Sequence, residues 1–211
     1  MNSSEPDAPA HQLRLSQQLE HIIKVTDHDR LSFTELAAHL HYRAWGALLF
    51  IFAAINVLPL PPGTTVFFAI PVLLVSGQMV AGRKAPWFPA RLNRRGITKA
   101  ELQRLLGKVE WLERRTDRII KPRLEGLTGP GASRLIGAAC FLLALIIAIP
   151  VPLLHHAPAA SVSLFALALI YRDGALVIVA SIAAVLSIIL DALIIGSGVV
   201  ALAHFASWIG L

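Results

Sequence analysis

The chain has 211 residues, of which 55% are hydrophobic and 15% are charged, whereas an ordinary soluble domain carries about 25% charged residues. This composition excludes a disordered chain and a collagenous repeat, and the single cysteine excludes a disulfide-stapled secreted fold. The formal net charge of +6 is concentrated between residues 82 and 133. From Asp173 to the last residue, only Asp173 and Asp191 are charged. We therefore predict an all-α integral membrane protein.

Residues 1–42 form a polar segment in which acidic residues outnumber basic ones. Apolar residues between Leu13 and Ile23 recur at helical spacing and predict a first short helix. A second helix is expected to start after Ser32, because Glu35 stands three residues later and completes a capping box. This second helix leads directly into the membrane at Tyr42–Trp45.

Two pairs of apolar segments follow, and closely spaced prolines divide each pair. The first pair is Ala44–Leu58 and Thr64–Gly82, and the run Pro59-Leu60-Pro61-Pro62-Gly63 divides it. The second pair is residues 134–149 and Ser161–Tyr171, and the run Pro150-Val151-Pro152 follows its first segment. The 15 residues of Ala44–Leu58 reach about 22 Å as a helix, which is short of a ~30 Å hydrocarbon core. Short helices with Pro-x-Pro breaks predict broken or re-entrant segments around a transport or binding site. The alternative is that the breaks are ordinary interfacial loops.

The polar interruption Arg172-Asp173-Gly174 precedes a last apolar stretch, residues 175–211. This stretch is too long for one membrane span, so we predict two helices. The division is expected near Asp191 or near Gly196-Ser197-Gly198.

The charged centre of the chain is strongly basic, which places it in the cytoplasm by the positive-inside rule. Thr98 is expected to cap a helix over residues 98–121, with Glu101 in the box position. Leucines on one face and basic residues on the other predict one interfacial amphipathic helix on the anionic inner leaflet. Binding of nucleic acid is disfavoured, because an anionic membrane surface is already adjacent. The residues expected at the membrane surface are Arg83, Lys84, Arg94, Arg95, Arg114 and Arg115.

These features divide the chain into consecutive parts. They are a polar N-terminal segment with short helices (1–42), a first membrane hairpin (43–82), a basic cytoplasmic amphipathic linker (83–133), a second membrane hairpin (134–174) and a C-terminal pair of membrane helices (175–211). The predicted location is the bacterial inner membrane, with several spans and the linker in the cytoplasm.

The two hairpins predict an internal repeat. A shift of 91 residues places Gly46 on Gly137, and it also superposes three further pairs: Phe50 on Phe141, Pro59 on Pro150 and Pro61 on Pro152. Matches between apolar segments arise easily by chance, but two prolines at the same spacing carry more weight. The sequence leaves open whether the repeats are parallel or inverted, because the number of full crossings is not fixed.

Four runs in a fixed order resemble the ExoD family of bacterial exopolysaccharide-synthesis proteins. They are Asn56-Val57-Leu58-Pro59-Leu60-Pro61-Pro62-Gly63, Arg83-Lys84-Ala85-Pro86-Trp87-Phe88-Pro89, Leu127-Thr128-Gly129-Pro130-Gly131 and Arg172-Asp173-Gly174. The resemblance covers residues 31–211 and implies an integral inner-membrane protein linked to exopolysaccharide production. It implies no catalytic residue, cofactor or substrate.

The candidate binding residues lie at the breaks and among the few polar residues of the apolar segments. Asp191 is either an ion or proton site or a turn residue at the interface. For Arg172 and Asp173 there are three alternatives: the two side chains pair with each other, they hold an anionic head group, or they cap the next helix. Asn56 and Gln78 either line a polar cavity or hold helices together. With the two breaks, the set is Asn56, Pro59, Pro61, Gln78, Arg172, Asp173 and Asp191.

No motif of an enzyme, a nucleotide site or a metal site is present, so we predict no cofactor and no metal. The leading hypothesis is a protein that moves an ion, a polysaccharide precursor or a lipid-linked intermediate, or assists that movement. The rival is a structural or regulatory partner of the polysaccharide machinery that docks through the basic helix. Small residues in the spans, such as Gly46 and Gly137, predict a homodimer.

Overall fold

The computed structural model describes residues 15–26, 30–40, 42–58, 64–83, 85–88, 90–116, 124–149, 151 and 154–208. Nearly all of these residues are helical, which confirms the predicted all-α class. The elements in chain order are α1 (Leu15–Val25), β1 (Arg30–Leu31), α2 (Phe33–Leu40), α3 (Tyr42–Val57), α4 (Thr64–Val80), α5 (Ala90–Arg95), β2 (Ile97–Thr98), α6 (Lys99–Thr116), η1 (Glu125–Thr128), α7 (Pro130–Ile147), α8 (His156–Tyr171) and α9 (Gly174–Trp208).

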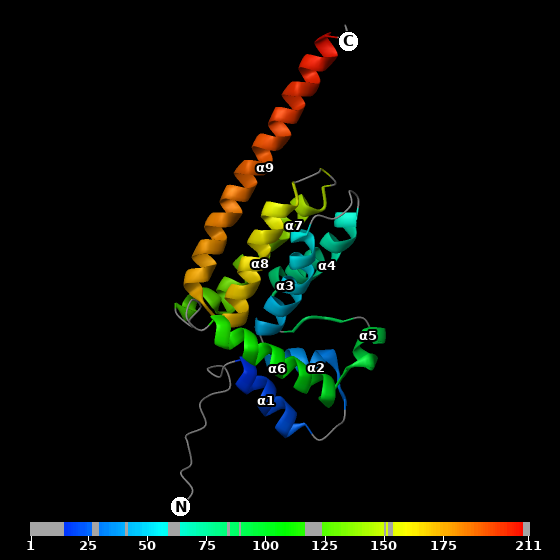
Figure 1. Ribbon diagram of the computed structural model, residues 1–211, viewed down its shortest axis with the longest axis vertical. Helices are drawn as coiled ribbons and strands as arrows, with labels where there is room; N and C mark the ends of the chain where they lie inside the picture. Colours follow the sequence, from blue (N-terminus) through cyan, green and yellow to red (C-terminus); the bar gives the residue numbers. More distant parts are fainter. Residues whose placement is uncertain are drawn as a thin grey trace, which may run out of the picture.

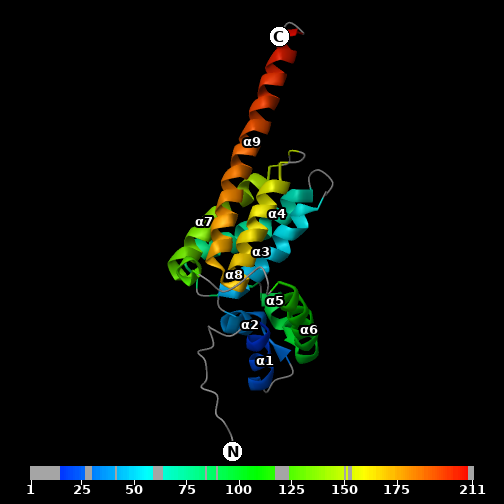
Figure 2. The ribbon, with the colours of Figure 1, turned by 60° about the vertical axis from the view of Figure 1, so that its left-hand side comes forward.

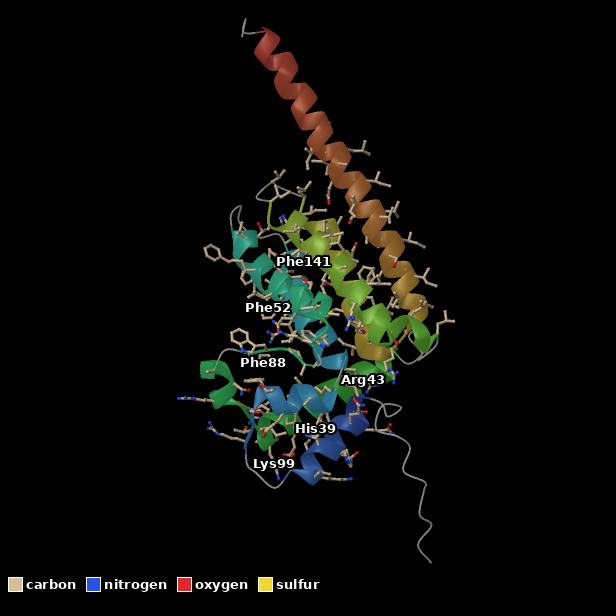
Figure 3. The ribbon with its side chains drawn as sticks, turned by 180° about the vertical axis from the view of Figure 1, so that it is seen from behind. His39, Arg43, Phe52, Phe88, Lys99 and Phe141 are labelled. Carbon is tan, nitrogen blue, oxygen red and sulfur yellow. The ribbon has the colours of Figure 1, made fainter. Side chains whose placement is uncertain are left out.

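The molecule has two parts (Figures 1 and 2). The basal module consists of α1, β1, α2, α5, β2 and α6, and the helical unit consists of α3, α4, α7, α8 and α9. Arg43, at the start of α3, lies at the junction between the two parts (Figure 3). The axes of α2 and α3 form an angle of 115°, so the chain turns sharply where it enters the helical unit.

The basal module joins two segments that are far apart in the sequence. Strand β1 pairs antiparallel with β2, with Leu31 opposite Ile97. Gly96, just before β2, has a φ of +56°, and an added Cβ would collide with the carbonyl oxygen of Leu31. The core of the module contains Leu19, Ile22, Leu31, Ile97 and Leu102. The polar N-terminal segment and the basic linker are therefore one unit, which the sequence analysis did not predict.

Both predicted capping boxes in the basal module are confirmed. The Ser32 N–H donates to Oε2 of Glu35 at 3.0 Å, and the Glu35 N–H donates to Oγ of Ser32 at 3.2 Å. The Thr98 N–H donates to Oε2 of Glu101 at 2.9 Å, and the Glu101 N–H donates to Oγ1 of Thr98 at 3.3 Å. Each box satisfies main-chain donors at the first turn of its helix and fixes where that helix begins.

Helix α6 corrects one expectation about the basic linker. The leucine face of this helix was predicted to lie on the membrane, but the side chain of Leu102 is fully buried in the core that α6 forms with α1 and the two strands. A leucine gains the same transfer free energy from a protein core as from lipid, so periodicity alone does not identify what covers it. At Leu102, the covering surface is protein.

In the helical unit, the hairpin α3–α4 packs against the hairpin α7–α8. Helix α3 packs most extensively on α8, and α4 packs on α7. The chain runs away from the basal module in α3 and α7 and returns in α4 and α8 (Figures 1 and 2). Both hairpins therefore point in the same direction. Helix α8 is central, because it contacts α3, α7 and α9.

The closest crossings of the two hairpins occur at equivalent glycines. A Cβ on Gly46 would lie 2.9 Å from Cγ1 of Ile170, and a Cβ on Gly137 would lie 2.7 Å from Cβ of Met79. The shift of 91 residues that places Gly46 on Gly137 also places Met79 on Ile170. The contact of Gly46 with Ile170 thus corresponds to the contact of Gly137 with Met79. This is the packing that a duplicated hairpin would give, and the duplication itself stays a prediction.

Helix α9 is one continuous helix, so the predicted division near Asp191 or Gly196-Ser197-Gly198 is wrong. No proline interrupts this stretch, and a single carboxylate does not remove a main-chain donor. The residues Gly174–Ser197 form a helical stretch of 24 residues that is long and apolar enough to cross a membrane. Figure 1 shows α9 continuing well past the ends of the other helices.

Candidate functional site

Asn56, His155 and Asp191 are buried polar side chains at the end of the helical unit remote from the basal module, and each has a side-chain atom without a hydrogen-bond partner. We call these three residues the distal layer. Asn56 lies ten residues beyond Gly46, which contacts Ala166 of the antiparallel α8, so Asn56 is level with the first turn of α8. Asp191 lies 17 residues beyond Gly174, and His155 lies 17 residues before Arg172. All three residues are therefore at the height where α8 begins.

Asn56 is fully buried near the end of α3. Its Nδ2 donates to the carbonyl oxygen of Phe52 at 2.9 Å, whereas its Oδ1 has no hydrogen-bond partner. The residue at the equivalent position of the second hairpin is Ile147, which is also fully buried. The same packing position is therefore apolar in one hairpin and polar in the other. A buried acceptor without a partner destabilises a fold by about 1–3 kcal/mol.

Asp191 lies within α9 and is 3% exposed. Along α9, the buried residues Val177, Ala180, Ala184, Ser187 and Asp191 form a stripe that faces the rest of the unit. Asp191 is the last member of this stripe, and its Oδ2 has no hydrogen-bond partner. The predicted alternative of a turn residue is therefore wrong, because the helix continues through this position.

His155 immediately precedes α8 and is 5% exposed, and its Nε2 has no hydrogen-bond partner. Its ring lies against the ring of His156, with centroids 4.0 Å apart. The sequence analysis did not select His155. The signal that was available is its place just after the second Pro-x-Pro break, where a buried polar residue would meet the start of a helix. Within the described ranges, no three His, Cys, Asp or Glu side chains gather closely enough to hold a metal ion.

Arg172 and Asp173 lie at the opposite, basal end of the unit. Arg172 ends α8 in the left-handed conformation with a φ of 56°, and its N–H donates to the carbonyl oxygen of Ala168. Oδ1 of Asp173 accepts hydrogen bonds from the N–H groups of Ala175 at 3.0 Å and Leu176 at 3.3 Å. Of the alternatives raised for Asp173, these bonds support capping of the next helix.

Gln78 connects α4 to the segment that follows it. Its Oε1 accepts a hydrogen bond from the N–H of Trp87 at 2.7 Å. The ring of Phe88 lies against the ring of Phe33 on α2, with centroids 5.7 Å apart. The N–H and Oγ1 of Thr34 donate to Oδ1 of Asn93 on α5 at 3.0 and 2.9 Å. Residues 85–88 therefore contact α4 through Gln78 and the basal module through Phe33.

The remaining predicted residues do not join the distal layer. Arg83 and Arg94 are exposed near the basal module. Arg95 belongs to α5, and Arg114 and Arg115 belong to α6. Pro59, Pro61 and Lys84 lie outside the described residues.

The comparisons with known proteins identify the family. The family described as "Exopolysaccharide synthesis, ExoD" matches residues 15–193. Protein ExoD of Rhizobium meliloti (strain 1021) is 31% identical over 120 residues, which cover 55% of this chain and 50% of that protein. The protein slr1875 of Synechocystis sp. (strain ATCC 27184 / PCC 6803 / Kazusa), described as uncharacterized, is 27% identical over 165 residues, which cover 76% of this chain and 77% of that protein.

No solved structure matches the chain. The match to the family extends from α1 into α9, so it includes both the basal module and the distal layer. The predicted resemblance is confirmed, and the chain belongs to the ExoD family.

Proposed function

We propose that this chain is a membrane-embedded component of exopolysaccharide synthesis that moves a small ion, a precursor or a lipid-linked intermediate through the distal layer. Membership of the ExoD family implies the role in exopolysaccharide synthesis. Three parts are proposed: that the helical unit is embedded in the membrane, that its basal end has a defined orientation, and that a solute moves through the distal layer. Each part rests on a separate feature of the helical unit.

The embedding is supported by the outward faces of the helical unit. Large apolar side chains are exposed on several helices, among them Phe67 at 74%, Leu135 at 74%, Leu142 at 58% and Leu193 at 65%. Water would make so extensive an apolar surface an aggregation hazard, whereas lipid solvates it. Helix α9 contributes the 24-residue apolar stretch Gly174–Ser197, whereas α3, α4, α7 and α8 have 16–18 residues, or about 24–27 Å, and are each shorter than the ~30 Å hydrocarbon core.

The orientation is supported by arginines at the basal ends of four helices. Arg43 and Arg134 lie in the first turns of α3 and α7, and Arg83 and Arg172 follow α4 and α8. The distal ends of these helices have no basic residue between Ile55 and Thr65 or between Ile147 and His155. By the positive-inside rule, the basal module lies in the cytoplasm and the distal layer lies toward the outer side of the inner membrane.

The movement is supported by one observation: Asn56, His155 and Asp191 each bury a polar atom that has no partner. Each such atom destabilises the protein by about 1–3 kcal/mol unless a ligand or water satisfies it. Polar residues at membrane depth are expensive and mark pathways for ions or polar solutes. The end of α3 lies beside the start of the antiparallel helix α8 at this layer, so the polar side chains of the two helices are at the same height.

The test compares variants of the distal layer in cells and in liposomes. Asn56→Leu and Asp191→Asn are expected to reduce secreted polysaccharide about tenfold or more, because each removes a ligand interaction of about 1–3 kcal/mol. Liposomes containing the protein report flux of sodium, potassium and a lipid-linked sugar phosphate. Ser76→Ala is the control, because Ser76 is also fully buried but its Oγ donates to the carbonyl oxygen of Val72 at 2.6 Å.

The proposal fails if Asn56→Leu and Asp191→Asn secrete polysaccharide like the parent protein and no probe crosses the liposome membrane. A second candidate function, docking to the polysaccharide machinery, is favoured by the basal module, which has its own core and exposes Arg30, Arg94 and Arg104. Changing these three arginines to Glu would then abolish recovery of the complex and leave flux unchanged. Leu102 is unsuitable for this test, because its loss would unfold the module.

A further inference from the structure

The two helix ends at the basal side of the helical unit hold different charges at equivalent positions. The shift of 91 residues places Arg43 on Arg134 and places Gly82 on Asp173. Both hairpins therefore have an arginine at the start of their first helix. Only the second hairpin has a carboxylate at the end of its second helix, and the first hairpin has a glycine there.

At the end of α8, the chain supplies charges of both signs. Asp173 is 1% exposed and Arg43 is 8% exposed, so both are buried. Nη1 of Arg43 donates to Oε1 of Gln18 at 2.8 Å, and Oδ1 of Asp173 accepts from the N–H groups that begin α9. The buried cation Arg43 on α3 and the buried anion Asp173 after α8 thus occupy the positions that correspond to Arg134 on α7 and Gly82 after α4.

At the end of α4, the arginine is present as Arg134, but Gly82 stands where the second hairpin has Asp173. Gly82 ends α4 with a φ of +70°, and the Arg83 N–H donates to the carbonyl oxygen of Gln78 at 3.2 Å. A Cβ on Gly82 would lie 2.5 Å from Nη2 and 2.8 Å from Cζ of Arg134. The guanidinium of Arg134 therefore lies directly over the place where the second hairpin has an aspartate.

The guanidinium groups of Arg83 and Arg134 are both exposed at this helix end. Within the part of the chain that the structure describes, neither group has a hydrogen bond to a side chain or an ion pair. Arg83 follows Gly82 directly in the chain, and the Arg134 guanidinium lies over Gly82, so the two unpaired arginines belong to the same helix end. Such a pair suits a phosphate group, because each guanidinium presents a planar fork of donors. The neighbouring apolar side chains are also exposed, with Leu135 at 74% and Trp87 at 60%.

We propose that Arg83 and Arg134 bind the phosphate of an anionic lipid head group at the end of α4, where Gly82 replaces the aspartate of the second hairpin. The exposed side chains of Leu135 and Trp87 favour a lipid over a free anion, because they provide an apolar surface for the acyl chains beside the two cations. The lipid supplies the negative charge that Asp173 supplies at the other helix end. This site lies at the basal end and is independent of the proposed movement through the distal layer.

The test measures thermal unfolding of the full chain in micelles of a neutral detergent. Phosphatidylglycerol is expected to raise the midpoint by about 3 °C or more relative to the same amount of phosphatidylcholine, because it binds only the folded chain. Inorganic phosphate is the third addition and distinguishes the free anion from the lipid. A shift with inorganic phosphate but none with phosphatidylglycerol would overturn the assignment to a lipid.

Two substitutions of Gly82 make a matched pair. Gly82→Asp and Gly82→Asn have nearly the same shape, tolerate a positive φ better than most residues and displace the Arg134 guanidinium equally. Gly82→Asp restores the carboxylate of the second hairpin, so we expect it to abolish the phosphatidylglycerol shift, whereas Gly82→Asn keeps it. Arg83→Gln, an exposed change that does not disturb α4, should also remove most of the shift.

Arg104→Gln is the control for loss of positive charge, because Arg104 is exposed on α6 in the basal module. Its phosphatidylglycerol shift should match that of the parent protein. The proposal is overturned if Gly82→Asp and Arg83→Gln keep the full shift, or if phosphatidylcholine stabilises the chain as much as phosphatidylglycerol. Neither result depends on how much polysaccharide the distal-layer variants secrete, so this test is separate from the test of the proposed function.

Discussion

The basal module and the helical unit are assembled in opposite ways. In the helical unit, each hairpin consists of two helices that are neighbours in the sequence, and the two hairpins then pack on each other. In the basal module, α1 and α6 contribute to one core although the whole first hairpin lies between them. The comparison teaches that the core of the module depends on the first hairpin, which returns the chain to the basal side and so brings α6 to α1.

The largest effect is expected from Leu102→Ser, which tests whether the basal module has a core of its own. Leu102 is fully buried between α6 and α1, so the change should destabilise the module by about 3–5 kcal/mol. Hydrogen exchange should accelerate in α1 and α6 and stay unchanged in α8. The control Gln103→Ser, on the exposed face of α6, should change stability by less than about 0.5 kcal/mol. Faster exchange throughout α8 would show that the two parts unfold together.

The next effect concerns the glycine crossings of the helical unit. Gly46→Ala and Gly137→Ala each place a Cβ against a neighbouring helix, at 2.7 Å from Ala166 O and 2.7 Å from Met79 Cβ. Each should destabilise the unit by about 1–3 kcal/mol in denaturant unfolding. Gly107→Ala in α6 is the control, because no atom lies within 4 Å of its added Cβ, and it should stabilise by about 0.5–1 kcal/mol. Unequal effects at the two crossings would argue against their equivalence.

A smaller effect is expected at the helix starts of the basal module. Ser32→Ala and Thr98→Ala each remove the side-chain acceptor of a capping box, at a loss of about 1 kcal/mol. Thermal unfolding followed by circular dichroism would measure the loss. Replacing Ser32 by Thr or Thr98 by Ser should restore most of it. A cap that contributes nothing would mean that packing alone fixes the start of its helix.

The smallest effect is the pH dependence at Glu101. Hydrogen bonds from the N–H and the hydroxyl of Thr98 hold the pKa of Glu101 below its ordinary value of 4.5. The stabilisation is therefore complete above the unfolded pKa and is lost as the pH falls through the lower folded pKa. Glu101→Gln should be less stable than the parent chain at pH 7, and the difference should vanish in acid. A difference that persists at low pH would exclude ionisation as its source.

Local signals predicted the helical elements well. The capping boxes, the apolar periodicity and the prolines gave the starts of α2 and α6 and both hairpins, because each signal depends on residues within one or two turns. Helix α9 was predicted as two helices, because its sequence is longer than one membrane span needs. No proline breaks the helix at the predicted positions, so it continues. The union of the polar segment and the linker depends on β1–β2 pairing and on Leu102, which no local pattern reveals.

The candidate site was predicted in part. Asn56 and Asp191 were selected because polar residues are costly in apolar helices, and both are buried with an unpartnered atom. His155 was not selected, because its burial follows from the fold of the second hairpin and not from a local pattern. Gln78 was expected either to line a polar cavity or to hold helices together, and its Oε1 accepts a hydrogen bond from the N–H of Trp87, a residue beyond the end of its own helix.

The contact between Gln78 and Trp87 has a mechanical consequence. One hydrogen bond joins the last turns of α4 to Trp87, and the next residue, Phe88, touches Phe33 at the start of α2. Helix α2 in turn leads into α3 across the 115° bend. The basal ends of the two helices of the first hairpin are therefore coupled through residues 85–88, so a displacement of α4 along its axis would be transmitted to the start of α2 and from there to α3.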